Sequence, residues 1–466
     1  MLNEAAQDFD GLRLGDRRLE ERARTTVTAL SVRPAAGAPT VLNGAELEGY
    51  YRFVNNERVS FAALLAAHAE ATVARAEGLT RVVVAHDTTD FRFADEVPRS
   101  GLGPMDNGGQ GFYAQFSLAV APERQPLGVV HVEPWTRKTR TSSAKTQKQR
   151  YENPSKEPLR WMRGVHRTDG LFSADTRVIH VMDREADDFD ILCDLFQGDY
   201  GFVVRASYDR RLVSEDNTNI CLKTFARKLQ VRCERKADLS SRRKNRPAKQ
   251  RKLYPPREVR RAKLAFAAQS VTLRRPDRSK AALPELKLNL VHVYEPSPPD
   301  NCEPIEWFLY TREPIGTKKQ IFQIVDDYRS RWLVEEFFKA LKTGCAYEKR
   351  QHETKDALLN ALGIFIPIAW ALLNMRTLSR DEQSANRPAH DVFTPSQLEL
   401  LRLEAKGKLS QAPTLREAVL LMAKVFGGLQ PSNGAPGWIV LGRAYEKLLT
   451  MEAGWRLAFK TLGIPA

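Results

Sequence analysis

Four residues in the C-terminal half of the chain have the types and spacing that phosphoryl-transfer chemistry needs. They are Tyr328, Arg331, Glu335 and Lys342. At about 100° per residue, an α-helix places all four within roughly 60° of one another, with Lys339 on the same stripe. A carboxylate can hold a metal ion and cations can hold phosphates. The stripe therefore indicates phosphoryl chemistry on a polyanion.

The other face of this segment is apolar and carries Leu333, Val334, Phe337 and Leu341. A single helix from Lys318 to Lys342 is therefore predicted, with the apolar face buried. Such a helix brings an acid, a phenol and several cations to one place.

The composition favours a polyanionic partner. The chain has 466 residues, 42% of them hydrophobic, with 72 Lys and Arg against 57 Asp and Glu, and a formal net charge of +15. This surplus favours nucleic acid, and a solvated basic surface is the alternative. The five cysteines form no Cys-x-x-Cys pair and the N-terminus lacks a signal segment, so we expect a cytoplasmic protein. The long apolar segment from Ala357 to Met375 is predicted as a buried helix, and no membrane partner is expected.

Two further acids follow predicted strands. Asp87 lies two residues past the apolar run Arg81–Ala85, and Asp183 directly follows the apolar run Arg177–Met182. Two more predicted strands complete a meander with the first: Phe112–Ala119 and Leu127–Val132. With Glu335 on the late helix, this order predicts an α/β fold with a ribonuclease-H-like (retroviral-integrase-like) catalytic core.

The three acids are predicted to hold two metal ions. In-line attack on a phosphodiester uses two cations about 3.5–4 Å apart. Mg²⁺ prefers hard oxygen ligands and keeps several waters, so Asp87, Asp183 and Glu335 suffice for two Mg²⁺, for which Mn²⁺ can substitute. An aspartate after a strand is also a common turn former. Three nearby acids are the competing candidates: Asp90, Glu185 and Asp187.

Three regions are predicted to position these residues. Residues 1–75 are expected to be helical. Residues 76–375 are expected to form the catalytic core, with a β-rich insertion at about 207–305, and residues 376–466 are expected to be helical. Two basic segments, Thr136–Lys156 and Arg242–Lys263, are predicted as loops. For the second segment, DNA contact and a disordered charged loop are both open.

The chain resembles the bacterial insertion-sequence transposases of the insertion sequence four family. These have an Asp-Asp-Glu triad and a Tyr-(2)-Arg-(3)-Glu-(6)-Lys signature, which is similar to Tyr328, Arg331, Glu335 and Lys342. The family motifs around the two aspartates resemble the segments 87–89 and 183–187. The resemblance extends outward to the segments 14–18, 51–56 and 436–438 and to the nearby Arg443 and Trp455. It implies that residues 1–75 are a DNA-binding domain and that residues 376–466 are a helical dimerisation region.

The resemblance implies a role for each site residue. Asp87, Asp183 and Glu335 would hold the two metals, and four residues would grip phosphates at the cleaved end: Tyr328, Arg331, Lys339 and Lys342. Arg205 would lie near a flipped nucleotide, and Trp307 would stack against a base during hairpin formation, with plain strand packing as its alternative. The candidates for end-sequence contacts are Arg17, Arg18 and Arg22, whose alternative is a solvated helix face.

The implied reaction is metal-dependent cut-and-paste transposition at terminal inverted repeats. It comprises end nicking, hairpin formation and resolution, and strand transfer. The partners would be double-stranded DNA, as transposon ends and as target, and a second copy of the chain in the paired-end complex, within the bacterial cytoplasm at the nucleoid. Apolar stripes of the C-terminal helices could serve the dimer or pack within one chain: Leu398, Leu401, Leu415, Val419, Met422 and Phe426. A nuclease or resolvase on the same core and a non-catalytic DNA-binding protein are the rival functions.

Overall fold

The structure is a computed structural model, and it describes residues 2–94, 96–106, 108–137, 159–213, 220–239, 258–277, 279–300, 302–378, 380, 387–430 and 436–462. Most of the two basic segments predicted as loops lies outside these ranges. The described end of the second segment, Arg260–Lys263, belongs to a strand and not to a loop. Its arginine Arg260 pairs with the buried Glu295, which explains the difference.

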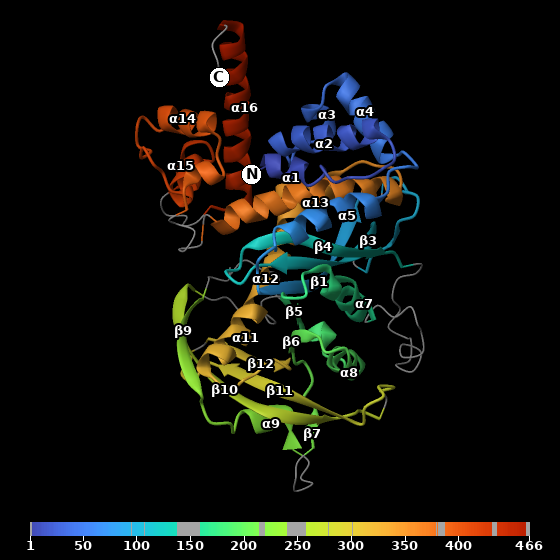
Figure 1. The fold of residues 1–466 in the computed structure, drawn as a ribbon, viewed down its shortest axis with the longest axis vertical. Coiled ribbons are helices and arrows are strands. Elements are labelled where there is room, and N and C mark those ends of the chain that lie inside the picture. Colours follow the sequence, from blue (N-terminus) through green and yellow to red (C-terminus); the bar gives the residue numbers. More distant parts are fainter. Residues whose placement is uncertain are drawn as a thin grey trace.

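Helices precede the sheet at the N-terminal end (Figure 1). They are α1 (Leu2–Gln7), α2 (Arg17–Val32), α3 (Ala38–Val41), α4 (Gly44–Val54) and α5 (Phe61–Ala74). Side chains cap three of them, because Asp16, Asn43 and Ser60 each accept a hydrogen bond from a backbone N–H in the first turn. Such caps satisfy backbone donors that a helix start leaves unpaired.

A 12-stranded mixed sheet follows, in the order β2-β3-β1-β5-β6-β12-β11-β10-β7-β8, with β4 beside β3 and β9 beside β10. The strands are β1 (Arg81–Phe93), β2 (Gly103–Pro104), β3 (Gln110–Val120), β4 (Pro126–Trp135), β5 (Arg177–Met182), β6 (Gly201–Arg205), β7 (Arg211–Leu212), β8 (Ile220–Cys221), β9 (Cys233–Leu239), β10 (Arg260–Arg274), β11 (Glu285–Tyr294) and β12 (Glu306–Thr311). The predicted meander is present, since β1, β3 and β4 are antiparallel neighbours.

The sheet does not stop where the predicted insertion begins. Strands β5 and β6 add to β1 in parallel, and β12 then pairs with β6 in antiparallel fashion. Through β12 the strands β11 and β10 join the same sheet. Helices α7 (Arg160–Thr168) and α8 (Phe189–Gln197) cover one face, and α9 (Leu222–Ala226) lies against the insertion.

Strand β1 is longer than predicted. It continues to Phe93 by pairing with β3, whereas its pairing with β5 ends at Ala85. Asp87 therefore lies inside a strand, at the level where the parallel pairing has stopped. The apolar run Arg81–Ala85 predicted only the first part of β1, where both faces of the strand are buried.

The predicted helix from Lys318 to Lys342 is divided into three parts. They are α11 (Lys318–Ser330), α12 (Trp332–Lys339) and the π-helical turn η4 (Ala340–Gly344). At Arg331 the chain tightens, because its N–H bonds to the Tyr328 carbonyl three residues back. At the other end the Cys345 N–H bonds to the Ala340 carbonyl five residues back, at 2.7 Å. A uniform 100° per residue therefore does not apply across the segment.

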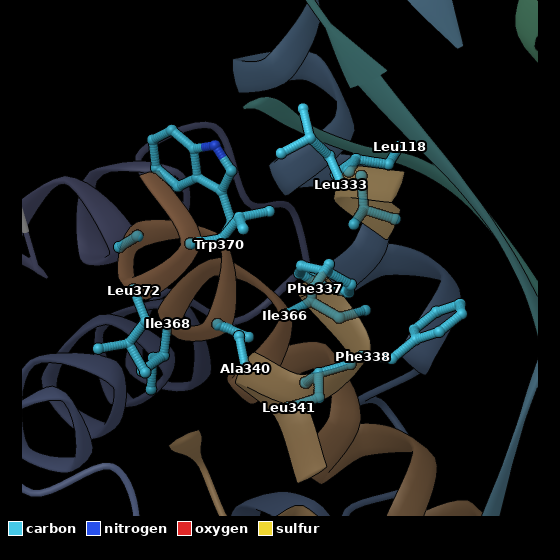
Figure 2. Packing of buried hydrophobic residues seen from close by; sticks show 14 of the residues in the cluster. Leu118, Leu333, Phe337, Phe338, Ala340, Leu341, Ile366, Ile368, Trp370 and Leu372 are labelled. Carbon is cyan, nitrogen blue, oxygen red and sulfur yellow. The ribbon is translucent and has the colours of Figure 1, made fainter. Parts of the chain in front are cut away.

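The helix α13 (Lys355–Leu378) is the centre of the core. It passes beneath the N-terminal helices and above the sheet (Figure 1). It is long and apolar enough to cross a membrane, yet 94% of its most apolar window is buried inside the protein. The predicted buried helix at Ala357 to Met375 is thus confirmed. Figure 2 shows Ile366 and Trp370 of α13 with Leu333 and Phe337 of α12 in the same apolar cluster.

The C-terminal helices are α14 (Pro395–Glu404), α15 (Leu415–Val425) and α16 (Trp438–Leu462). Their predicted apolar stripes are used within the chain, because Leu401, Leu415, Val419 and Met422 are fully buried. The alternative of packing within one chain is therefore the correct one for these residues. Past Glu452 no described side chain of α16 is buried, and this end of the helix stands clear of the rest (Figure 1).

Candidate active site

Asp87 and Asp183 lie at the same level on neighbouring parallel strands. In the register of β1 with β5, Ala85 is opposite Val181, and each acid comes two residues later. Asp183 caps the short turn after β5 by accepting a hydrogen bond from the Glu185 N–H at 2.8 Å. The carboxyl ends of parallel strands meet at one edge of a sheet, so the two acids share this edge.

Arg331 connects two of the three predicted acids. Its Nη1 donates to Asp87 Oδ2 at 2.6 Å, and its Nη2 donates to Glu335 Oε1. The side chains of Arg331 and Asp87 are 13% and 16% exposed, so water screens the pair only in part. The Arg331 guanidinium thereby holds Glu335 of α12 beside Asp87 of β1.

Asp87 lies in an environment that favours its neutral form. Burial, together with the negative charges of Asp183 and Glu335, raises the pKa of Asp87 to about 7, although the charge of Arg331 acts in the opposite direction.

The carboxylate oxygens of Asp87, Asp183 and Glu335 are suitable ligands for a hard divalent cation. Carboxylate oxygens are the ligands that Mg²⁺ prefers. In the described ranges, however, no three His, Cys, Asp or Glu side chains converge closely enough to hold a metal ion. Arg331 provides the positive charge between Asp87 and Glu335 in this arrangement.

Lys342 belongs to a second acidic group further along β1. Its Nζ lies 3.3 Å from Asp90 Oδ1 and 3.7 Å from Glu348 Oε1. Asp90 comes three residues after Asp87 in the extended strand, which is about 10 Å along it. The predicted single stripe is therefore divided between two groups of acids, because the tight turn and the π-helical turn change the helix phase.

Lys339 lies one helical turn after Glu335 on α12. Its Nζ pairs with Glu336 Oε1 at 2.6 Å and lies 5.1 Å from the ring centroid of Trp332. Glu336 is buried and also pairs with Arg376 of α13. The phosphate contact proposed for Lys339 stays a prediction.

Trp307, Tyr328 and Arg205 form an aromatic cluster on the β6–β12 side of the acids. The rings of Trp307 and Tyr328 meet edge to face, with centroids 5.6 Å apart. The Arg205 guanidinium lies 5.8 Å from the Trp307 centroid, and burial lowers the pKa of Arg205. Tyr328 is only 6% exposed, so its ring is packed and not displayed on an open stripe. Half-buried Trp307 packs against the core and also contacts the arginine.

The three N-terminal arginines lie around one hollow. Arg17, Arg18 and Arg22 line a depression of about 510 Å³ between α2 and α4. Arg18 is exposed and pairs with the capping Asp16 at 3.1 Å. Sequence reasoning missed Gly49, where a Cβ would lie 2.8 Å from the Arg22 guanidinium carbon. A glycine inside the helix α4 was the available signal for this close approach.

Asp187 has a structural role. It is 1% exposed, accepts the backbone N–H groups of Ser207 and Tyr208, and pairs with Arg210 at 2.7 Å. These contacts fix the chain that leaves β6. The Asp187 carboxylate therefore stabilises the fold and is not a candidate metal ligand.

A buried hydrogen-bonded chain lies under the strand that carries Asp87, and sequence reasoning missed it. Ser117 Oγ contacts His86 Nδ1 at 2.9 Å, and His86 Nε2 contacts His180 Nδ1 at 2.9 Å. His180 Nε2 then contacts Asp169 Oδ1 at 3.1 Å. These hydrogen bonds connect β3, β1 and β5 next to the candidate site.

Comparison with known proteins bears on the N-terminal helices. Residues 3–59 match the family described as Transposase DNA-binding. These residues carry a transposase DNA-binding domain. The hollow that Arg17, Arg18 and Arg22 line lies within this transposase DNA-binding domain.

Among solved structures, the chain is similar to a piggyBac transposase in a synaptic complex with hairpin DNA, with a TM-score of 0.31 and 10% sequence identity. The match covers 81% of this chain and 54% of that chain, so this chain spans about half the length of the piggyBac transposase. The similarity is too distant to place any single residue.

Proposed function

We propose that this chain is a DNA transposase with an Asp-Asp-Glu triad, of the insertion sequence four type, built on a ribonuclease-H-like core. The observation that carries the proposal is the meeting of Asp87 with Glu335 through Arg331, beside Asp183 at the end of the parallel pair β1–β5. The transposase DNA-binding domain at residues 3–59 supports DNA as the partner. The strand order β4-β3-β1-β5-β6, with its antiparallel meander and two parallel additions, supports the ribonuclease-H-like core.

Asp87, Asp183 and Glu335 would hold two Mg²⁺ ions, or Mn²⁺ in their place. Such ions would activate the attacking oxygen and stabilise the leaving oxygen of an in-line displacement. The chain's own residues prepare the place: the β1–β5 register aligns the two aspartates, and Arg331 keeps Glu335 beside Asp87. Partial burial strengthens each charge interaction there.

Cations and aromatic rings on both sides of the acids would hold the DNA. Arg205 with Trp307 lies on the β6–β12 side, and Lys342 lies further along β1. The N-terminal arginines would contact the transposon end. We further propose that two chains pair two ends, and that the reaction passes through nicking, hairpin formation, hairpin resolution and strand transfer in the bacterial cytoplasm.

The test is a pair of assays on the DNA that flanks the gene. Incubation of full-length protein with a duplex of the flanking inverted repeat and Mg²⁺ should give a nick at the repeat boundary. Adding a target plasmid should give joined products. Nicking without joining would favour a nuclease or resolvase. Binding without any cleavage in Mg²⁺ or Mn²⁺ would contradict the proposed activity.

A further inference from the structure

A second cleft opens next to the acids, on the β3–β4 side of the sheet. Its volume is about 650 Å³. It includes Thr88, which follows Asp87, and Glu185, which lies two residues after Asp183. Its other lining residues are Thr89, Asp90, Arg92, Asp106, Tyr113, Trp135, Arg137, Arg160 and Trp161.

One wall of this cleft is a pair of stacked rings. Tyr113 of β3 is opposite Trp135 of β4 in the strand register, and their rings lie 5.6 Å apart at an angle of 20°. The Arg137 guanidinium lies 4.2 Å from the Tyr113 centroid, and that of Arg160 lies 5.1 Å from the Trp135 centroid. Both rings are half-buried. Flat aromatic and guanidinium faces of this kind are what an unstacked base packs against.

Among the described residues that line the cleft, three arginines pair with three acids. Arg92 pairs with Asp90 at 2.7 Å, and Arg137 pairs with Asp106 at 2.6 Å. Glu185 pairs with a third arginine of the cleft at 3.0 Å. A site for phosphate alone would carry an excess of positive charge, whereas paired arginines and acids offer donors and acceptors to the polar edge of a neutral base.

The cleft also contains a buried donor. Trp161 is 1% exposed, and its indole N–H has no hydrogen-bond partner among the described residues. An unpaired buried donor is costly, and Trp161 places one in the wall of the cleft.

The position of the cleft indicates where along a DNA strand the bound base would lie. The acids lie between this cleft, on β3 and β4, and the Trp307 cluster, on β12 and β6. Lys342 lies on the cleft side of the acids, because it pairs with Asp90, which lines the cleft. A DNA strand that crosses the sheet edge with its phosphate at Asp87 therefore has an aromatic site on each side of that phosphate.

We propose that the Tyr113–Trp135 cleft binds one unstacked nucleobase of a DNA strand, next to the phosphate that reacts and on the side opposite to Trp307. The inference rests on the proposed function. Two strands can supply such a base, namely the strand of the transposon end and the strand of the target.

Photocrosslinking of full-length protein tests this directly. 5-Iododeoxyuridine would be placed at one position at a time, on either side of the reacting phosphate, first in the flanking inverted repeat and then in a target duplex. We expect an adduct on Tyr113 or Trp135, found by mass spectrometry, from a position on one side only. The labelled duplex that gives the adduct identifies the source of the base.

Variants sharpen the test. Trp135→Ala should lower the adduct yield about tenfold, the change that corresponds to one lost base–aromatic stack. Trp135→Phe should retain most of it. Tyr208→Ala is the matched control, because Tyr208 is 62% exposed, lies 5.3 Å from the Arg210 guanidinium and is outside the cleft.

Two outcomes would overturn the inference. One is a wild-type protein that binds and nicks the labelled DNA but forms adducts only on aromatic residues outside the cleft. This result needs no variant and leaves the proposed function standing. The other is a protein that neither binds nor cuts the flanking repeat, which removes the proposed function together with the inference.

Discussion

The phenol oxygen of Tyr50 lies 2.9 Å from Nε2 of His352 in a buried hydrogen bond. Tyr50 belongs to the helix α4 of the DNA-binding domain, and His352 follows the signature helices. Close by, Arg350 donates to the backbone carbonyls of Pro34 and Ala36. The DNA-binding domain is thus attached to the chain segment that carries Lys342, and the two are expected to move as one unit.

The first prediction concerns pH. Burial, followed by the charges of Arg350 and Arg99, lowers the pKa of His352 from 6.5 to about 4. The pKa of His352 is lower in the folded state than in the unfolded state. Its contribution to the free energy of unfolding is therefore complete above pH 6.5 and is lost as the pH falls toward 4. At pH 5 the free energy of unfolding should be about 2 kcal/mol lower than at pH 8 through this residue alone.

Chemical denaturation of wild type and His352→Gln across pH 5 to 8 would check this. The other buried histidines lose stability in the same direction, and Asp87 acts in the opposite direction, so the difference between the two proteins is the quantity to compare. Equal pH dependence in both proteins would contradict the assignment to His352.

The second prediction concerns the triad. Asp87→Ala, Asp183→Ala and Glu335→Ala should each abolish nicking in Mg²⁺ and leave binding of the transposon end largely unchanged, because binding depends on cations elsewhere. A gel assay of both properties is the measurement. Exposed Asp175 provides the matched control. Asp187→Ala is unsuitable as a control, since that carboxylate holds the chain after β6. Nicking at near wild-type rate by any triad variant would exclude that residue as a ligand.

The third prediction concerns Trp307. A base leaving the stack costs a few kcal/mol, and one aromatic stack returns about 1–3 kcal/mol. Trp307→Ala should therefore slow hairpin formation roughly 5- to 150-fold, with much less effect on first-strand nicking. Trp307→Phe should restore most of the rate. Because Trp307 also covers Tyr328, melting temperatures must be compared. Equal slowing of both steps would assign Trp307 to packing alone.

The fourth prediction concerns salt. Binding of the transposon end should weaken steeply as salt rises, because each phosphate contact releases counterions. Leu239 and Arg260 are paired neighbours in β9 and β10, so residues 240–257 can be replaced by a short Gly-Ser turn without cutting the sheet. If this basic segment contacts phosphates, the replacement should flatten the salt dependence. An unchanged slope in a folded variant would indicate that the segment does not touch DNA.

The fifth prediction concerns the paired-end complex. The end of α16 carries exposed Leu457 and Leu462, 66% and 69% exposed, beside the stacked pair Trp455 and Phe459. Leu457→Glu should remove paired-end complexes from a native gel and leave single-end binding unchanged. Leu403→Glu on α14 is the control, because Leu403 is similarly exposed at 54%. Paired complexes of normal yield in the Leu457 variant would place the dimer contact elsewhere.

The strands and the apolar helix faces could be predicted from the sequence because they depend on local patterns. The predicted strands at Phe112–Ala119 and Arg177–Met182 correspond to β3 and β5. Leu333 and Phe337 are buried as their spacing indicated. The parallel pairing of β1 with β5, which brings Asp87 and Asp183 to the same end of the sheet, is a long-range contact that these local patterns do not specify.

The contacts of Lys339 and Lys342 could not be predicted in the same way. They depend on a tight turn at Arg331 and a π-helical turn after Lys339, and no residue pattern in the segment marks either one. The pairing of Arg331 with Asp87 and the pairing of Asp187 with Arg210 likewise join residues that are distant in the sequence. The continuation of the sheet into the insertion depends on the pairing of β12 with β6, which the sequence alone does not specify.

The order in which the chain is made has a consequence for this protein. Asp87 meets Arg331 across 244 positions of sequence, and Tyr50 meets His352 across 302. On a ribosome that adds about 5–20 residues per second, neither contact can form until most of the chain has emerged. A nascent or truncated chain therefore lacks both the assembled acids and a firmly attached DNA-binding domain. Premature termination before Arg331 would therefore yield fragments in which neither contact exists.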